Sequence, residues 1–232
     1  MNTIEKLGDE ETFRNIVERT ITEFEDNEIE KLERYAFSSC SKLASVSLPV
    51  ATSIKSYAFY NCSALTSVSL PAVTGIDIYA FDFCSALTSV SLPSVTSIED
   101  VAFGSCSALT SVSFPAATSI GSSAFEACSA LTSVSFPVAT SIGSSAFSDC
   151  KALTSVSSPV ATSIGNYAFY NCNALTTLYI GTESDTVCTL SNTGAIPSSV
   201  TDIYVPDALV ESYKTATNWS SFANKIKAYT GV

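Results

Sequence analysis

The sequence predicts an α/β solenoid, a stack of rungs in which each rung buries its apolar residues against its neighbours. Two observations carry this prediction: an Ala-Phe pair recurs every 22 residues, and a Cys follows each Phe three positions later. A fixed period in this range is typical of solenoids, whose repeats cannot bury a core alone. The recurring residues are Phe37, Phe59, Phe81, Phe103, Phe125, Phe147 and Phe169, with Cys40, Cys62, Cys84, Cys106, Cys128, Cys150 and Cys172.

An alternating segment in each rung predicts a short strand. In one copy Leu65, Val68 and Leu70 are the apolar positions, and serines alternate with the last two. Pro71 ends this segment, because proline cannot donate to a strand ladder. Successive rungs wind in the same sense, so their strands are expected to pair in parallel. With partial rungs at both ends, the stack has about nine strands.

The rest of each rung is predicted to form a short helical turn. Its apolar residues are spaced by four, four and three positions, which suits one buried helical face. In the second copy they are Ile54, Ala58, Cys62 and Leu65. Helical segments pack at about 8–10 Å, whereas disulfides need Cα atoms within about 7 Å. The sequence therefore predicts reduced thiols.

The chain is predicted to be a single solenoid domain over residues 1–232. Exposed ends of a stack need covering, so helical caps are expected at both ends. The predicted division is an N-terminal helical cap at 1–19, repeats with a longer last copy at 20–206, and a C-terminal helical cap at 207–232. Trp219, the only tryptophan, is predicted to seal the core of the second cap.

One expected core position carries a polar residue. The third apolar position of the strand holds Leu, Phe or Ile in the other copies but Ser158 in the sixth. A buried hydroxyl without a partner costs about 1–3 kcal/mol. We therefore expect Phe136, Ile180 or a water molecule to fill the gap.

Composition and charge exclude several classes of function. The net charge is −11, and only 14% of residues are charged, so a nucleic-acid partner, which requires a basic patch, is not expected. Residues 1–37 contain 11 of the 22 acidic residues, which we interpret as a solvated cap, with a basic partner as the alternative. The charged first twenty residues predict no secretory leader, and no membrane span or anchor is expected.

No residue pattern indicates catalysis. The chain has no His, which removes the usual Cys-His and Ser-His-Asp systems, and its repeated cysteines lie too far apart for paired zinc ligands. A glycine-rich phosphate loop is also absent from the sequence. The prediction is a non-enzymatic protein with no catalytic residues, no cofactor and no metal.

The repeated pattern resembles that of a known family. Its rungs read Leu-x-x-Val-x-Leu-Pro, then Ile-x-x-x-Ala-Phe-x-x-Cys-x-x-Leu, over residues 20–206. This is similar to the Treponema-type (BspA-like) leucine-rich repeat. The resemblance implies a right-handed leucine-rich-repeat solenoid, a horseshoe with parallel strands on its concave face and short helical turns on its convex face. Many members are cell-surface proteins with roles in adhesion, and the end of the chain resembles proteins of gut bacteria and their phages.

The candidate contact residues lie where the copies differ. The strand face is lined by serines, which binding hot spots use less than Tyr, Trp or Arg. The period places an aromatic and acidic group on neighbouring rungs, which could mark a contact site or cover the seams between rungs. This group is Tyr57, Tyr60, Asp77, Tyr79 and Phe83, with Tyr167 and Tyr170 as a second, smaller group. A cation held by Asp77, Glu99 and Asp100 is an alternative to ordinary surface charge.

Three functional hypotheses follow. The first is a protein-binding or adhesion scaffold that acts as a monomer on a host or bacterial surface protein, with the cell surface or a virion as its implied location. The second is a structural component of a phage particle or larger assembly, joined through the end caps. The third is a glycan-binding module that uses Tyr179 and the two tyrosine groups as stacking platforms.

Overall fold

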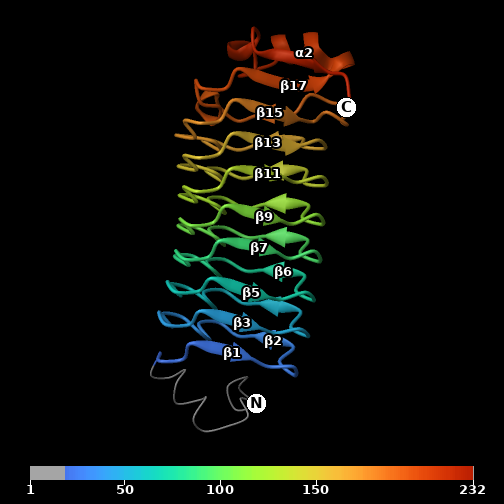
Figure 1. The fold of residues 1–232 in the computed structure, drawn as a ribbon. Helices are drawn as coiled ribbons and strands as arrows, with labels where there is room; N and C mark the ends of the chain where they lie inside the picture. Colours follow the sequence, from blue (N-terminus) through green and yellow to red (C-terminus); the bar gives the residue numbers. More distant parts are fainter. Residues whose placement is uncertain (1–18, 232) are drawn as a thin grey trace.

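The computed structural model describes residues 19–231, which form a parallel-strand solenoid of about nine turns. Figure 1 shows the turns stacked in chain order. The first column of strands has apolar residues at its centres facing the core. Its members are β1 (Glu23–Glu25), β3 (Ser45–Ser47), β5 (Ser67–Ser69), β7 (Ser89–Ser91), β9 (Ser111–Ser113), β11 (Ser133–Ser135), β13 (Ser155–Ser158), β15 (Thr177–Ile180) and β17 (Asp202–Pro206).

A second column of two-residue strands, which the sequence analysis did not predict, runs along another side of the stack. It pairs as one continuous sheet of eight strands, all parallel. Its buried isoleucines and leucines close the core opposite the first column. The strands are β2 (Lys31–Leu32), β4 (Ser53–Ile54), β6 (Gly75–Ile76), β8 (Ser97–Ile98), β10 (Ser119–Ile120), β12 (Ser141–Ile142), β14 (Ser163–Ile164) and β16 (Thr189–Leu190).

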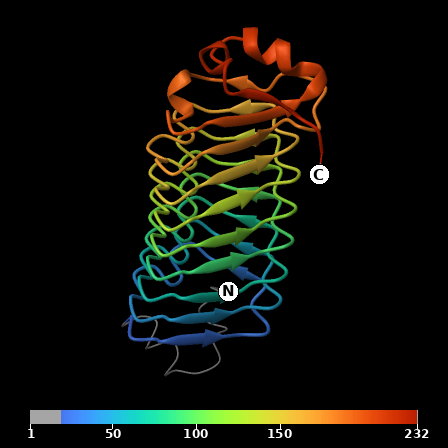
Figure 2. The same cartoon turned by 45° about the horizontal axis from the view of Figure 1, so that its top comes forward.

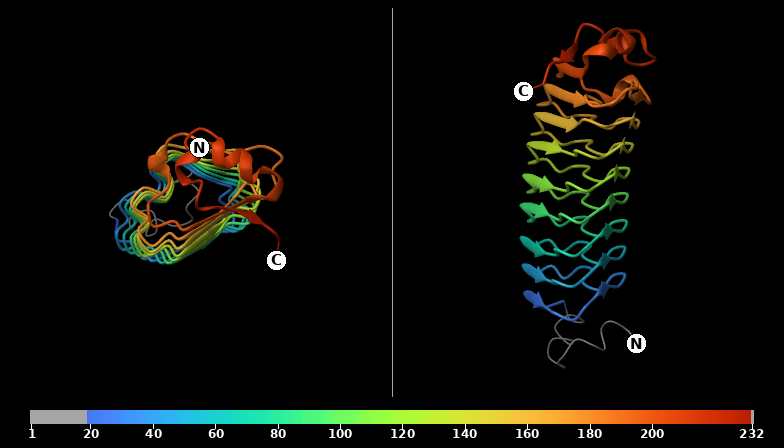
Figure 3. Two further views of the ribbon diagram at one scale, coloured as in Figure 1. Left: turned by 90° about the horizontal axis from the view of Figure 1, so that it is seen from above. Right: turned by 90° about the vertical axis from the view of Figure 1, so that its right-hand side faces the viewer.

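The predicted strands and their parallel pairing are confirmed. Val46 pairs with Val68 and Val134 with Val156, so equivalent residues of successive repeats lie side by side. The partial rungs at the two ends are also confirmed, as β1 and β17. Viewed along the axis, the rungs superimpose as one repeated outline (Figure 3), because the 22-residue copies share one length and register.

The repeated phenylalanines form a continuous ladder inside the stack. All seven are buried, and neighbouring ring centroids lie 5.0 to 5.7 Å apart in nearly parallel planes. Stacked rings of this kind add about 0.5–1.5 kcal/mol per pair beyond area burial. The invariance of this position therefore reflects packing.

The predicted helical turns are wrong. Tyr57 and Asn61 have φ angles of 61° and 57°, a left-handed conformation that a right-handed helix cannot contain. The loop backbone bonds to the next rung instead: the Phe59 N–H donates to the Ala80 oxygen at 2.8 Å. Equivalent left-handed residues and bonds recur in the other copies. Local spacing indicated a helix, but hydrogen bonds to residues about one repeat away determine the loop.

The horseshoe expectation is not confirmed, because the views in Figures 1 and 3 show a nearly straight stack. Strands are spaced about 4.8 Å apart. The loops are also joined by backbone hydrogen bonds, and their phenylalanine rings repeat at 5.0 to 5.7 Å. Neither side of the rung is much thicker than the other, so stacking produces little curvature.

All eight cysteines are buried thiols, although the distance argument used to predict them was wrong. The rungs at this position are not separated by helix packing. Six of the eight thiols each donate to the carbonyl oxygen of a phenylalanine 25 residues earlier, at 2.9 to 3.2 Å. Burial raises the pKa of Cys62 and Cys128 to about 12, which keeps each thiol protonated as a donor. The six donors are Cys62, Cys84, Cys106, Cys128, Cys150 and Cys172.

Ser158 finds a protein partner for its buried hydroxyl. Its Oγ donates to the Ala139 carbonyl at 3.3 Å, and the side chain is fully buried. The register predicted for this strand is confirmed, since Ser158 pairs with Ile180. The buried hydroxyl therefore has a hydrogen-bond partner, a backbone carbonyl that could not be predicted from the sequence.

The C-terminal end is a mixed cap, and the prediction of a helical cap holds only in part. It contains the short helices η3 (Asp207–Leu209), α2 (Val210–Thr215) and η4 (Ser220–Phe222), but it ends in strand β18 (Ile226–Tyr229), which pairs in parallel with β17. The longer last repeat contains η2 (Thr193–Ala195). Figures 1 and 2 show the cap lying across the end of the stack.

Trp219 seals this cap, as predicted. Its Nε1–H donates to the Cys188 carbonyl at 2.6 Å, and its ring meets Tyr213 edge-on at 5.2 Å. The expected N-terminal helical cap, 1–19, lies almost entirely outside the described residues, and the single-domain division remains a prediction. Among residues 19–231, no helix is long and apolar enough to cross a bilayer.

Candidate functional site

The loop that follows each second-column strand carries the side chains that differ most between copies. Its Ala, Phe and Cys face the core, while the residue before Ala is at least partly exposed in every copy. The residue after Phe is buried at Asp82, Gly104 and Ser148 and more exposed in the other copies. Four aromatic side chains at these loop positions are among the most exposed large hydrophobic residues described. They are Tyr35 at 54%, Phe83 at 46%, Tyr167 at 51% and Tyr170 at 55% exposure.

The structure brings the four predicted rings of the first group together. Tyr57 stacks on Tyr79 with centroids 4.8 Å apart and planes 14° apart. Tyr60 meets Tyr57 edge-on at 5.6 Å and Phe83 edge-on at 5.9 Å. Desolvation, together with the neighbouring Tyr79 and Tyr35 phenols, raises the pKa of Tyr57.

Two members of this surface were not predicted from the sequence. Tyr35 stacks on Tyr57 at 4.9 Å, and the Arg34 guanidinium carbon lies 5.5 Å from the Tyr35 ring centroid. The 22-residue period placed Tyr35 in the same column, so this signal was available in the sequence. We call the set Tyr35, Tyr57, Tyr60, Tyr79 and Phe83 the N-terminal aromatic cluster.

Asp77, the acidic member of the predicted group, faces a lysine and has no recorded ring contact. Its carboxylate lies 3.8 Å from Lys55 Nζ, and both side chains are partly exposed, so this ion pair adds little stability. The Asp100 carboxylate accepts the Ser122 N–H at 2.6 Å. Within residues 19–231, no three His, Cys, Asp or Glu side chains are arranged to hold a metal ion, so the structure gives no support for the cation alternative.

A buried carboxyl group lies beside the aromatic cluster. Asp82 is 4% exposed, and it packs over Gly104, where an added Cβ would lie 2.6 Å from Oδ1. Burial, with a smaller contribution from the Glu126 charge, raises the pKa of Asp82 to about 6. A backbone hydrogen bond from Phe83 acts in the opposite direction. The loop below Phe83 therefore contains a group that titrates near neutral pH.

The two rings of the second predicted group contact each other. Tyr167 and Tyr170 meet edge-on, with centroids 5.9 Å apart and planes 85° apart. Ser145 and Ser148 occupy the equivalent positions one rung earlier. The pair is therefore separated from the N-terminal aromatic cluster by rungs that carry small residues there.

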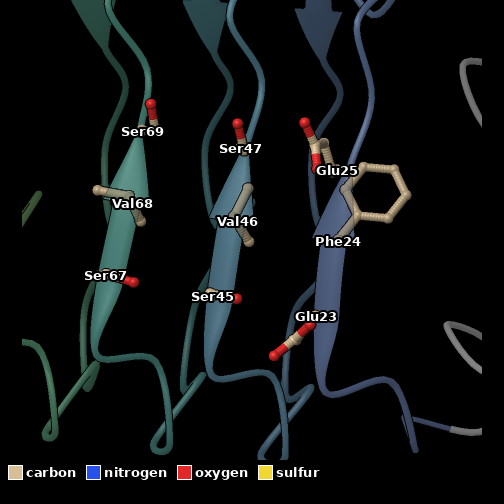
Figure 4. A pocket seen from close by; sticks show the side chains of 9 residues that line it. All are labelled: Glu23, Phe24, Glu25, Ser45, Val46, Ser47, Ser67, Val68 and Ser69. Atoms are coloured by element: carbon tan, nitrogen blue, oxygen red, sulfur yellow. The ribbon is translucent and has the colours of Figure 1, made fainter.

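The first-column strands present a serine face, as predicted, with acidic residues at its first strand. A hollow of about 320 Å³ is lined by residues of β1, β3 and β5. Figure 4 shows Glu23 and Glu25 on either side of Phe24, with serine pairs on the next two strands. The hollow contains no cationic side chain.

A third aromatic group lies at the opposite end of this face. Tyr179 stacks on Tyr204 at 5.0 Å, and Tyr229 meets Tyr179 edge-on at 5.9 Å. Beside them, Lys227 Nζ donates to the Asp202 carboxylate and lowers the pKa of Asp202. The sequence analysis named only Tyr179, because it predicted a helix where β18 places Tyr229.

Comparison with known proteins agrees with this geometry. The BspA type leucine-rich repeat region matches the chain in six copies, over residues 6–132, 74–194 and 118–217. No curated protein matches. A leucine-rich repeat protein of T. pallidum is similar in structure, with 27% identity and a TM-score of 0.62, covering 81% of this chain and 86% of that one.

Two further solved structures have a lower sequence identity and a lower TM-score. A leucine-rich cell surface protein from Faecalibacterium prausnitzii has 20% identity and a TM-score of 0.37, covering 91% of this chain and 88% of that one. A leucine-rich repeat protein from Bacteroides ovatus has 18% identity and a TM-score of 0.39, covering 87% and 88%. The family match alone spans most of the chain. This protein belongs to the BspA-type leucine-rich repeat family, whose members are typically non-enzymatic scaffolds.

Proposed function

We propose that this protein is a binding or adhesion scaffold that recognises another protein through the N-terminal aromatic cluster. The observation that carries the proposal is the contact of five rings on adjacent loops, with Tyr35 and Phe83 about half exposed. Interface hot spots are enriched in tyrosine, and clustered rings bury large area at low entropic cost. The serine face offers no comparable group in its central strands.

The partner we propose is a host or bacterial surface protein that presents basic groups around an apolar patch. Glu99 and Asp100 are exposed one rung beyond Asp77, and the whole chain carries a net charge of −11. Such a charge favours encounter with a basic surface and makes the association rate sensitive to salt. The family resemblance implies action at a cell surface or on a virion.

Differential capture tests the proposal. Immobilised protein is exposed to host and bacterial surface extracts, and retained proteins are quantified by mass spectrometry for the wild type and for Tyr60→Ala/Tyr79→Ala/Phe83→Ala. Truncation of one hot-spot residue costs about 2 kcal/mol, or about 30-fold in affinity, so the triple variant should lose the specific partner.

A matched control removes three polar side chains from the strand face. Ser89→Ala/Ser111→Ala/Ser133→Ala should retain the same partner as the wild type, because these side chains lie on the other face of the rung. If the Tyr60/Tyr79/Phe83 variant still captures the partner and the serine variant does not, the contact lies on the strand face. Light scattering checks the proposed monomer; a stable oligomer that is lost on changes in α2 would support an assembly component instead.

A further inference from the structure

A shallow, open notch beside Tyr167 is large enough to hold a small ligand. It measures about 480 Å³ and is lined by Ser145, Ser148, Tyr167 and Tyr170. Ligand pockets commonly enclose about 300–1,000 Å³. Its walls are two aromatic rings set at 85°, and its remaining lining is hydroxyl-bearing.

The chain itself shows what fits beside such a tyrosine pair. The Tyr57–Tyr60 pair occupies the same loop positions and also meets edge-on, at 5.6 Å and 67°. There the face of Tyr57 is covered by the ring of the preceding rung, Tyr35, at 4.9 Å. The preceding rung of the second pair carries Ser145 at this position. Val101 and Ser123 hold the same position in the two rungs before that one, so no ring of the column covers this face of Tyr167.

The Tyr167 ring is fixed in place from its other side. Gly194 packs so closely against it that an added Cβ would lie 2.9 Å from Tyr167 Cε1. The Tyr167 N–H also donates to the Asn192 side-chain oxygen at 3.4 Å. These contacts come from the longer last repeat, and they hold the ring before any ligand arrives, which reduces the entropic cost of binding.

A line of hydrogen-bonded polar side chains leads away from the notch. Ser148 Oγ donates to Asp149 Oδ2 at 3.4 Å, and the Asn171 amide donates to Asp149 Oδ1. Asn173 donates to Asn171 at 2.9 Å, which extends the line. The line begins at Ser148, which lines the edge of the notch and is 6% exposed. Asp149 makes this edge unfavourable for an anionic ligand, and the four lining residues carry no charge at neutral pH.

We propose that this notch binds a neutral pyranose ring of a glycan. A pyranose has an apolar C–H face, which suits the electron-rich face of Tyr167, and a rim of hydroxyl groups, which suits the Ser145 and Ser148 hydroxyls. A purely aromatic occupant would fill the slot but leave the polar rim unused. The site is distinct from the N-terminal aromatic cluster and does not depend on the function proposed for it.

A glycan array followed by saturation-transfer NMR with methyl glycosides tests the proposal. Neutral hexose or N-acetylhexosamine probes should bind, and sialylated versions should not bind better. Ser145→Tyr should place a ring against Tyr167 and block the notch, weakening binding at least tenfold while the protein stays folded. Tyr167→Ala should have a similar effect, and Val101→Tyr, which adds a tyrosine at the same loop position three rungs earlier, should not.

Three results would overturn the inference. The first is the absence of any bound neutral sugar on the array. The second is binding that persists in the folded Ser145→Tyr variant. The third is binding of N-acetylphenylalaninamide, and not of glycosides, which would identify an aromatic protein side chain as the occupant. Protein capture through Tyr60, Tyr79 and Phe83 is measured separately, so failure of either proposal can be told apart from failure of the other.

Discussion

At the scale of single residues, conserved positions within the repeat and variable ones have different roles. The repeated Phe and Cys side chains are buried, and each is held by the rung beside it through ring stacking or a thiol hydrogen bond. They stabilise the stack and have no access to a partner. The loop position before Ala holds Tyr, Val or Ser and is at least partly exposed in every copy, so it can differ between copies without disturbing the core.

Asp82 gives the molecule a pH dependence that can be measured. Its pKa in the folded chain is about 6, above its ordinary 3.8, so between these values the folded state binds the proton more tightly than the unfolded state. The free energy of unfolding should therefore fall as pH rises from about 4 to about 6, by about 1–3 kcal/mol. Urea unfolding at a series of pH values measures this change.

Asp82→Asn is the matching variant, because a neutral amide cannot ionise beside Glu126. It should be more stable than the wild type at pH 8 and should show a smaller change between pH 4 and 6. Asp185→Asn, in the exposed insert of the last repeat, should keep the wild-type change. If the free energy of unfolding of Asp82→Asn changes between pH 4 and 6 as much as that of the wild type, another group is responsible for the titration.

At the scale of elements, the spacing between rungs depends on residues that allow close approach. Gly121, Gly143 and Gly165 follow the second-column strands, and their N–H groups donate to the preceding rung at 2.8 Å. Asp77 and Glu99 make the equivalent bond at 3.1 Å. Lys55 makes it at 2.9 Å, so the bond recurs with and without glycine along this side of the stack.

Gly143→Ala should destabilise the protein by about 1–3 kcal/mol, because overpacked sites cost this much. An added Cβ would lie 2.5 Å from the Gly121 carbonyl carbon, which is backbone and cannot rotate away. At Gly75 the nearest atom to an added Cβ is Ser97 Oγ at 4.0 Å, so Gly75→Ala should change stability by at most about 0.5 kcal/mol. Equal effects of the two variants in urea unfolding would show that the rungs are not in contact as described.

The strands could be predicted from the sequence because their signal is local. Leu65, Val68 and Leu70 alternate with polar residues, and Pro71 marks the end of the segment. The aromatic cluster could also be predicted, since an exact period places Tyr57 and Tyr79 on adjacent rungs.

The loops and the last strand could not be predicted in this way. Spacings of four, four and three fit a helix equally well, and the bonds that determine the loop reach residues one repeat away. The position of Tyr229 beside Tyr179 depends on the path of the cap, which brings β18 alongside β17. No periodic signal extends that far, so the third aromatic group was missed in part.

At the scale of the whole molecule, the stack is a one-dimensional array in which each rung is supported by its two neighbours. All eight thiols lie in its interior, from Cys40 in the loop after β2 to Cys188 at the C-terminal cap. A thiol-specific reagent such as Ellman's reagent should therefore react slowly in native buffer and should modify eight thiols per chain in denaturant. Fast modification of several thiols without denaturant would mean that the interior opens locally.

The central claim is that this solenoid contacts its partner through the divergent loops and not through its regular serine face. Site-specific photo-crosslinking tests it most directly, with p-benzoylphenylalanine placed at Phe83 in one sample and at Ser111, in the middle of β9, in another. The account predicts a crosslink to the captured partner from position 83 and none from position 111. A crosslink from position 111, with none from position 83, would contradict it.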